Sequence, residues 1–262
     1  MATKKEEREA RREERRQAEV EEQQRAQRQR RVKLVSAAVF LAVIAVVVVI
    51  VVSQSGGGSS GGDSSNLTGQ AKVAKELKGI PQNGAVLGDP SAKATLIEYG
   101  DLQCSTCQFY AEQILPPIIA GPVRSGQAKI EFRPVEVIGP ESVPASAAAG
   151  AAGEQAKFWS YIELFYANQG AENSGYVTDA FMTSVAKGAG VPDIGKWEGS
   201  RKSPTWNQQL SQHKSQFRKF GFTGTPSFAI QSGSAAPKAI PGQEGTTVLP
   251  LAALEAAIKQ AG

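Results

Sequence analysis

The feature that most constrains this chain is a pair of cysteines, Cys104 and Cys107, at the junction between a predicted strand and a predicted helix. The apolar run Ala94–Tyr99 precedes them and predicts a buried strand, because short apolar runs bounded by turn residues are typical of one. Apolar and aromatic side chains then follow at helical spacing, which predicts a helix beginning near Cys104. The chain of 262 residues contains two cysteines, so neither thiol has another thiol partner within the protein.

A sulfur at the start of a helix is stabilised as a thiolate. The first turn of a helix has unpaired backbone N–H groups and a partial positive charge, which lower the pKa of a thiol below its free value of about 8.5. Cys104 occupies this position, and Cys107 follows one turn later, within reach of a disulfide. The thiolate is the attacking species in thiol–disulfide exchange.

Three interpretations of the pair differ in their chemistry. A structural zinc site uses four ligands, whereas the chain offers two cysteines and one histidine, His213. A structural disulfide would restrain the unfolded chain little, because it would close a very short loop. We favour a redox-active pair, supported by the strand before it and by Thr225-Pro226 far along the chain.

The excess of basic residues lies at the N-terminus. Residues 1–33 hold 12 of the 29 Lys and Arg residues and 8 of the 25 acidic residues, so their net charge of +4 equals that of the whole chain. The interspersed glutamates argue against a nucleic-acid-binding arm, and the absence of an apolar heptad pattern argues against a coiled coil. We predict a solvated, charged tail without a nucleic-acid partner.

Residues 34–52 form a run of 19 residues without a charged side chain. As a helix, at about 1.5 Å per residue, this run would nearly span a hydrocarbon core of about 30 Å. A cleaved signal peptide is the alternative, but its apolar region is typically about 7–15 residues long and ends at a small-x-small cleavage site. Ser53-Gln54-Ser55 is a weak candidate for such a site, so we favour a retained transmembrane anchor.

Charges on the two sides of the run predict its orientation. Residues 28–33 include four basic residues, whereas no charge follows the run until Asp63. The positive-inside rule therefore predicts a single-pass protein of the cell membrane, with a cytoplasmic N-terminus and an extracytoplasmic domain. The Gly- and Ser-rich residues 53–70 predict a flexible linker spanning on the order of 20 Å, and residues 71–262 predict a folded domain.

The first half of this domain contains two predicted strands. Besides Ala94–Tyr99, residues 129–138 alternate between apolar and polar side chains, which predicts a second strand. Between them, Pro116 is expected to end or kink the helix that begins at the cysteines, because proline removes a backbone donor.

The second half begins with a helical block. Residues 142–220 show helical spacing and no strand pattern, which predicts a helical insertion in which His213 is exposed. Thr225-Pro226 then opens a strand at residues 228–230, since proline is tolerated at the start of a strand. Residues 251–261 predict a final amphipathic helix.

This order of elements resembles the thioredoxin fold with a helical insertion, as found in the DsbA-like family of extracytoplasmic thiol–disulfide oxidoreductases. The resemblance covers residues 79–260 and implies an α/β fold class. Three segments carry it, and together they are specific: EYGDLQCSTC at residues 98–107, FWSY at 158–161 and GTPSF at 224–228.

The resemblance implies a role for each site residue. Cys104 would be the nucleophile that forms the mixed disulfide, and Cys107 the buried resolving thiol. Thr225 and Pro226 would form the cis-proline loop that lies against the cysteines and pairs with an extended substrate. Glu98 would be a buried acid that exchanges a proton with the second cysteine; the alternative is a salt-bridged or edge-facing Glu98.

One dipeptide departs from the family pattern. Strongly oxidising members of the family have Pro-His between the cysteines, whereas this chain has Ser105-Thr106. Neither of these side chains carries a charge, so one contribution to the stability of the thiolate is missing. The stability of the reduced form sets oxidising power, so the direction of net electron flow stays open.

We predict an enzyme: a membrane-anchored, extracytoplasmic oxidoreductase that exchanges disulfides with exported proteins and is reset by a membrane or thiol redox partner. The location fits this chemistry, because disulfides persist outside the cytoplasm. No cofactor or metal is predicted. The alternative is a non-enzymatic chaperone or binding module on the same fold.

Overall fold

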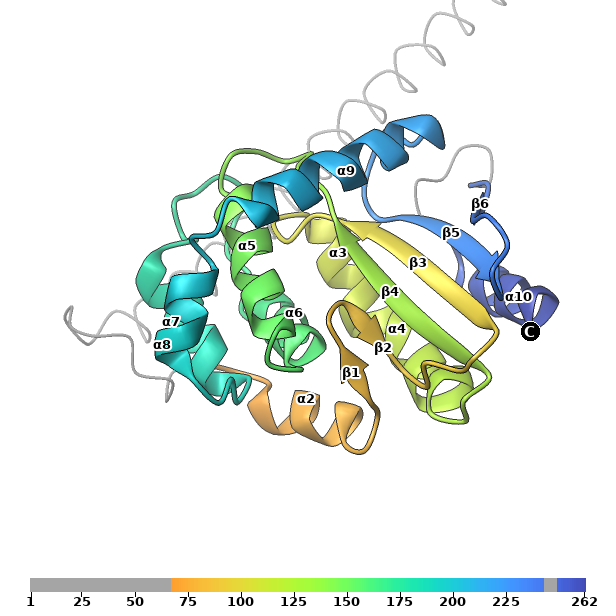
Figure 1. Ribbon diagram of the computed structural model, residues 1–262, viewed down its shortest axis with the longest axis horizontal. Coiled ribbons are helices and arrows are strands. Elements are labelled where there is room, and N and C mark those ends of the chain that lie inside the picture. Colours follow the sequence, from red (N-terminus) through yellow and green to blue (C-terminus); the bar gives the residue numbers. More distant parts are fainter. Residues whose placement is uncertain (1–66, 243–248) are drawn as a thin grey trace, which may run out of the picture. The chain divides into compact units, whose positions relative to one another are not determined.

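The structure, a computed structural model, describes residues 67–242 and 249–262. A six-stranded sheet forms its centre, in the order β1-β2-β4-β3-β5-β6 (Figure 1). Strand β3 pairs in parallel with β4 and antiparallel with β5. The strands are β1 (Gln82–Asn83), β2 (Val86–Leu87), β3 (Ala94–Gly100), β4 (Ala128–Pro134), β5 (Ser227–Ser232) and β6 (Lys238–Ala239).

Strand β3 is buried along its whole length, because β4 and β5 flank it on its two edges and both faces of the sheet are covered. Successive side chains of a strand point to opposite faces. Leu96 and Glu98 therefore share one face, and Ile97 and Tyr99 share the other. Leu96 belongs to the larger hydrophobic cluster, which also contains Cys107, whereas Ile97 and Tyr99 belong to a second cluster. Glu98 therefore lies on the cysteine side of the sheet.

A continuous helical segment connects β3 to β4. It consists of α3 (Ser105–Phe109), η2 (Tyr110–Ile114), α4 (Leu115–Ile118) and η3 (Ile119–Val123). We expected Pro116 to end or kink this helix. The helix does not end there, because it continues through Pro116 and Pro117. The turns before and after the prolines are π-helical, and this change of hydrogen-bonding pattern accommodates the missing proline donors.

The predicted helical insertion is confirmed between β4 and β5. Helix α9 returns across the face of the sheet that carries Tyr99, where its Phe217 packs, while α10 packs on the opposite face against β3 and β5 (Figure 1). The short helix α8 was not predicted. The remaining helices are α2 (Gln70–Leu77), α5 (Ser142–Gly153), α6 (Phe158–Ala167), α7 (Asp179–Gly188), α8 (Ile194–Ser200), α9 (Thr205–Lys219) and α10 (Leu251–Ala261).

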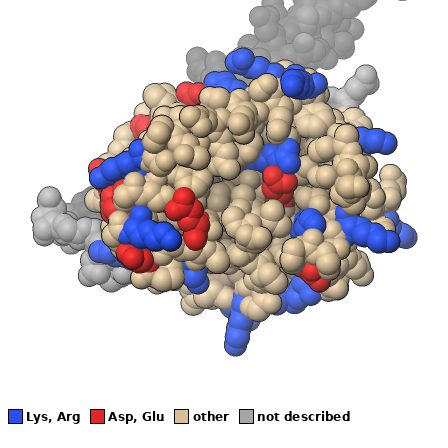
Figure 2. All heavy atoms as spheres, viewed as in Figure 1, with Lys and Arg blue, Asp and Glu red and all other residues tan. Residues whose placement is uncertain are grey.

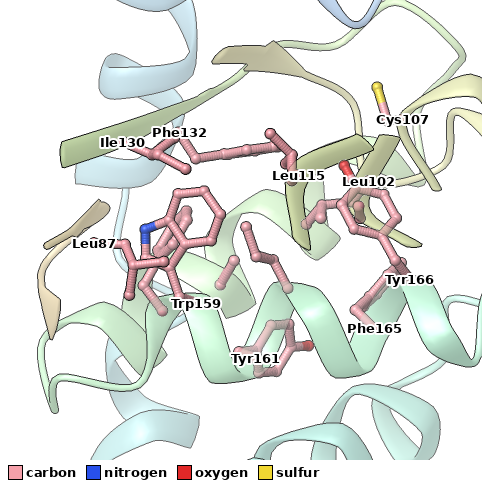
Figure 3. Packing of buried hydrophobic residues seen from close by; sticks show 14 of the residues in the cluster. Leu87, Leu102, Cys107, Leu115, Ile130, Phe132, Trp159, Tyr161, Phe165 and Tyr166 are labelled. Atoms are coloured by element: carbon pink, nitrogen blue, oxygen red, sulfur yellow. The ribbon is translucent and has the colours of Figure 1, made fainter. Parts of the chain in front are cut away.

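Buried aromatic side chains lie on two sides of α6 (Figure 3): Trp159 faces the sheet, whereas Tyr161 and Phe165 pack against Trp197 of α8 and Phe181 of α7. The Trp159 ring meets Phe132 of β4 edge-on, with ring centroids 6.3 Å apart, and its indole N–H donates to the Ala85 carbonyl at 2.9 Å. Phe165 and Tyr166 are also fully buried. Complete burial stabilises the fold by about 1.5–3 kcal/mol per large apolar side chain, so α6 joins the insertion firmly to the sheet.

The position of His213 corrects another prediction. We expected an exposed helix residue, but α9 lies against β4 and leaves His213 half-buried. Its Nδ1 lies 3.2 Å from the Pro134 carbonyl. Burial lowers the pKa of the imidazole, since desolvation disfavours the charged ring.

The predicted tail and anchor, and most of the predicted linker, lie outside the described residues. Within residues 67–242 and 249–262, every helix is too short or too polar to cross a membrane. On the face shown in Figure 2, acidic and basic side chains are scattered among uncharged ones. This face therefore presents no field of a single sign.

Candidate active site

The two cysteines lie at the start of α3, as the sequence predicts. Cys104 is the residue preceding the helix, with an extended backbone (φ −73°, ψ 120°), and Cys107 lies in the first turn. Both are thiols in this structure. Cys104 is 5% exposed and Cys107 is fully buried, so an incoming sulfur can reach Cys104 first.

A loop far along the chain covers Cys104. The Cys104 thiol donates to the Thr225 carbonyl at 3.3 Å, and the peptide bond between Thr225 and Pro226 is cis, as the resemblance implies. Strand β5 starts at Ser227, which pairs with Tyr99 at the end of β3. This pairing brings Thr225 to the end of β3 from which the cysteines follow.

The surroundings of Cys104 favour its thiolate. Its pKa is lowered to about 6, chiefly by a hydrogen bond from the Cys107 thiol and also by the backbone N–H groups of Cys107 and Thr106, while partial burial opposes the shift. The unpaired N–H groups of the first helical turn therefore act on the sulfur as the sequence argument predicts.

Cys107 has the opposite environment. Burial raises the pKa of its thiol well above the usual range, and its hydrogen bond to Cys104 and the charges of Cys104 and Glu98 act in the same direction. The two surroundings thus favour a thiolate at Cys104 and a protonated thiol at Cys107. This division of roles is what a two-step exchange requires.

Glu98 is buried beside this pair and is 1% exposed. Among the described residues it forms no ion pair, and its Oε2 has no hydrogen-bond partner. Desolvation raises its pKa to about 8, with the negative charge of Cys104 as the second cause. The alternative of a salt-bridged or edge-facing Glu98 is therefore wrong, because β3 is a central strand.

A buried aspartate shapes the turn before Cys104. Asp101 accepts from Gln103 N through Oδ1 at 2.9 Å, and from Val137 N and Ile138 N through Oδ2 at 2.8 and 2.9 Å. Cys104 N in turn donates to the Asp101 carbonyl at 3.0 Å. The carboxylate thus fixes the active-site turn against the loop that follows β4.

Contacts from the helical insertion complete the site, and sequence reasoning missed them. Between α6 and α7, Gln169 donates to the Leu102 carbonyl at 3.1 Å, and Asn173 N donates to Gln103 Oε1 at 2.9 Å. These partners are about 70 residues apart in the sequence, and no local pattern marks them. The polar run at residues 168–175 was the only available signal.

All five residues assigned to the site from the sequence gather at one place. Cys104, Cys107 and Thr225 meet at the start of α3, Pro226 directly follows Thr225 through the cis bond, and Glu98 acts electrostatically on both sulfurs from β3. Within the described ranges, no group of three or more His, Cys, Asp or Glu residues is arranged to hold a metal ion.

Comparison with known proteins agrees with this geometry. A family model described as "Thioredoxin" matches residues 81–239. The "Probable disulfide bond formation protein D" of Bacillus cereus is 24% identical over 155 residues, covering 58% of this chain and 71% of that protein. The "Disulfide bond formation protein D" of Bacillus subtilis is also 24% identical, over 59% of this chain and 68% of that protein.

Solved structures share the fold. The oxidised BdbD of Bacillus subtilis superposes with a TM-score of 0.58 at 21% identity, covering 70% of this chain and 96% of that one. The DsbA of Chlamydia trachomatis gives a TM-score of 0.53 at 17% identity, covering 67% and 90% of the two chains. The chain therefore belongs to the thioredoxin family, and its fold is that of the DsbA-like thiol–disulfide oxidoreductases.

Proposed function

We propose that the protein is a membrane-anchored, extracytoplasmic oxidoreductase that exchanges disulfides with exported proteins through Cys104 and Cys107. One observation carries the proposal: a thiol whose pKa is lowered to about 6 lies at a helix start, against the Thr225 carbonyl, one turn from a buried thiol. The names of the Bacillus relatives support disulfide formation as the physiological direction.

The exchange follows from the unequal surroundings of the two sulfurs. In the oxidising direction, a substrate thiolate attacks the Cys104 sulfur of the Cys104–Cys107 disulfide, and Cys107 leaves and takes a proton. A second substrate thiolate then attacks the substrate sulfur of the mixed disulfide, and Cys104 leaves as a thiolate. The substrate loses two electrons and the pair gains them. A leaving thiol with a low pKa leaves faster, which favours this direction.

Glu98 provides a proton store for Cys107. A negative Cys104 is one of the two causes that raise the pKa of Glu98. In the mixed disulfide that charge is absent, so Glu98 ionises more readily at the stage when Cys107 must lose a proton in the reducing direction. In the oxidising direction, the same carboxyl returns a proton to the departing Cys107. Without this acid, the proton would have to cross a fully buried site.

The predicted anchor supports the cellular setting. As a helix, residues 34–52 would nearly span a hydrocarbon core of about 30 Å, and the basic residues before them favour an extracytoplasmic domain. Thiol–disulfide chemistry on protein substrates suits that compartment, where disulfides persist.

Trapping of the covalent intermediate tests the proposal. Cys107→Ala should leave mixed disulfides between Cys104 and exported proteins, because the resolving thiol is gone. Cys104→Ser is the matched control and should trap none. The trapped species should appear on non-reducing gels and disappear with reductant. Absence of mixed disulfides in Cys107→Ala, together with no disulfide exchange by the wild type on reduced RNase or on insulin, would overturn the proposed function.

A further inference from the structure

A carboxylate from the helical insertion lies at the start of the active-site helix. Glu172, in the segment between α6 and α7, accepts a hydrogen bond from Ser105 N at 2.9 Å. Ser105 is the first residue of α3 and directly follows Cys104. The contact joins residues 67 positions apart, so it is made by the tertiary structure and not by the local chain.

The N–H groups of the first turn of α3 are divided between two acceptors. Those of Thr106 and Cys107 stabilise the Cys104 sulfur, whereas that of Ser105 is used by Glu172. A carboxylate at this position offsets part of the positive charge of the helix N-terminus. It also opposes a second negative charge on the neighbouring sulfur.

Hydrogen bonds of the residues that follow Glu172 hold its backbone in place. The next residue, Asn173, donates its N–H to Gln103 Oε1 at 2.9 Å and its side-chain amide to the Ile138 carbonyl at 3.1 Å. Gly175 N donates to Glu141 Oε1 at 2.9 Å. Although the Glu172 side chain is exposed, its backbone is therefore fixed against the active-site turn.

We propose that Glu172 is a positioning residue that limits the oxidising strength of the Cys104–Cys107 pair by holding a negative charge beside the reduced form. This inference rests on the proposed function. The disulfide form carries no charge on Cys104, so Glu172 destabilises the reduced form selectively, and a less stable reduced form makes a weaker oxidant. Among the described residues, Glu98 of β3, Cys107 of α3 and Tyr166 of α6 interact electrostatically with Cys104, and none of the three is a cation.

Substitution of Glu172 by glutamine separates charge from structure. In Glu172→Gln the amide oxygen still accepts from Ser105 N, while the charge is lost. Equilibration of the full-length variant with reduced and oxidised glutathione should show the pair more oxidising, by about threefold in the equilibrium constant, the effect expected of one charge at a helix terminus. The rate of Cys104 alkylation against pH should show a lower pKa for Cys104, and both differences from wild type should shrink at high salt.

Glu141→Gln is the matched control, because Glu141 binds the same segment through Gly175 N but not the active-site helix. Its glutathione equilibrium should equal that of wild type, and urea unfolding of the oxidised forms should be the same for all three proteins. An unchanged glutathione equilibrium in Glu172→Gln, or an equal shift in Glu141→Gln, would overturn the inference. The proposed function would still stand in either case, provided that the wild type exchanges disulfides. A wild-type pair that does not exchange with glutathione or protein thiols would remove both.

Discussion

At the scale of single residues, Ser105 and Thr106 stand between the cysteines where strongly oxidising members of the resembled family have Pro-His. Neither adds a positive charge, and no Lys or Arg lies between Ala94 and Pro122 in the sequence. The pKa of Cys104, lowered to about 6, lies between about 7 for thioredoxin and about 3.5 for DsbA. We therefore expect a reduction potential between about −270 mV and about −120 mV, the values of those two proteins.

A histidine between the cysteines should strengthen the oxidant. The Thr106 N–H already acts on the Cys104 thiolate, and in Thr106→His an imidazolium would add a positive charge close to that sulfur. We expect the potential to rise by about 30 mV or more, where 30 mV is about 1.4 kcal/mol for two electrons. Glutathione equilibration measures both proteins. A wild-type potential already equal to that of DsbA, or no rise in the variant, would show that another group sets the stability of the thiolate.

The buried carboxyl Glu98 should make stability depend on pH. Its folded-state pKa, about 8, lies above the ordinary value of 4.5, so between these values the unfolded chain releases a proton that the folded protein keeps. Folding is therefore penalised increasingly from pH 4.5 to pH 8, and below pH 4.5 the penalty vanishes. Glu98→Gln should stabilise the protein at pH 8 by at least about 1 kcal/mol, since one pKa unit is about 1.4 kcal/mol.

Urea unfolding at pH 5 and pH 8 measures this effect. The gain from Glu98→Gln should be larger at pH 8, whereas Glu154→Gln, at the exposed position that directly follows α5, should match wild type at both values. Glu98→Gln should also resolve mixed disulfides more slowly than wild type, because the buried acid that takes the proton of Cys107 is gone. A stability gain independent of pH would mean that Glu98 is ionised in the folded protein.

At the scale of elements, the segment between α6 and α7 is held to the active-site turn by Gln103. This side chain is fully buried, donates to Ser142 Oγ at 3.0 Å and accepts from Asn173 N at 2.9 Å. Gln103→Ala would leave the buried Ser142 hydroxyl without this bond and would remove the acceptor of the part-buried Asn173 N–H, which should lower the free energy of unfolding by about 1–3 kcal/mol. Gln208→Ala, on the exposed side of α9, should change it by less than about 0.5 kcal/mol in urea unfolding. An equal, small effect of both substitutions would contradict this role for Gln103.

The sequence predicted the elements that have local signals. The apolar run of β3, the helix after Cys104, the helical insertion and the final helix all have a clear periodicity, and the structure confirms them. The two cysteines and Thr225-Pro226 could be placed together because the resemblance joins distant motifs. The path of the helix through Pro116, by contrast, depends on π-turns that leave no mark in the sequence.

The contacts between the insertion and the turn before Cys104 could not be predicted either, because no local pattern marks them. Glu172, Asn173 and Gln103 are ordinary polar residues in polar stretches, and they meet beside the cysteines only because α6 packs between the rest of the insertion and the sheet. Contacts between residues about 70 positions apart are set by that packing. Periodicity and spacing along one chain carry no information about them.

At the scale of the whole molecule, the sequence predicts a catalytic domain tethered close to a membrane. A linker of residues 53–70 that spans on the order of 20 Å would keep Cys104 near the bilayer surface while leaving it free to turn. Exported chains emerging from the membrane would then meet the site at a high effective concentration. A shortened linker would restrict how the domain turns toward these chains, so it should slow oxidation of exported proteins without changing the glutathione equilibrium of the purified protein.

The orientation across the membrane is the last prediction and decides whether this arrangement holds. Four basic residues at positions 28–33 precede the apolar run of residues 34–52, and no charge follows it until Asp63, so the positive-inside rule places the tail in the cytoplasm. Protease added to intact spheroplasts should cut the exposed linker and release the domain, while an epitope on the N-terminal tail stays protected until the membrane is lysed. Protection of the domain would reverse the orientation. Recovery of the domain in the soluble fraction before protease treatment would show that the apolar run is cleaved as a signal peptide.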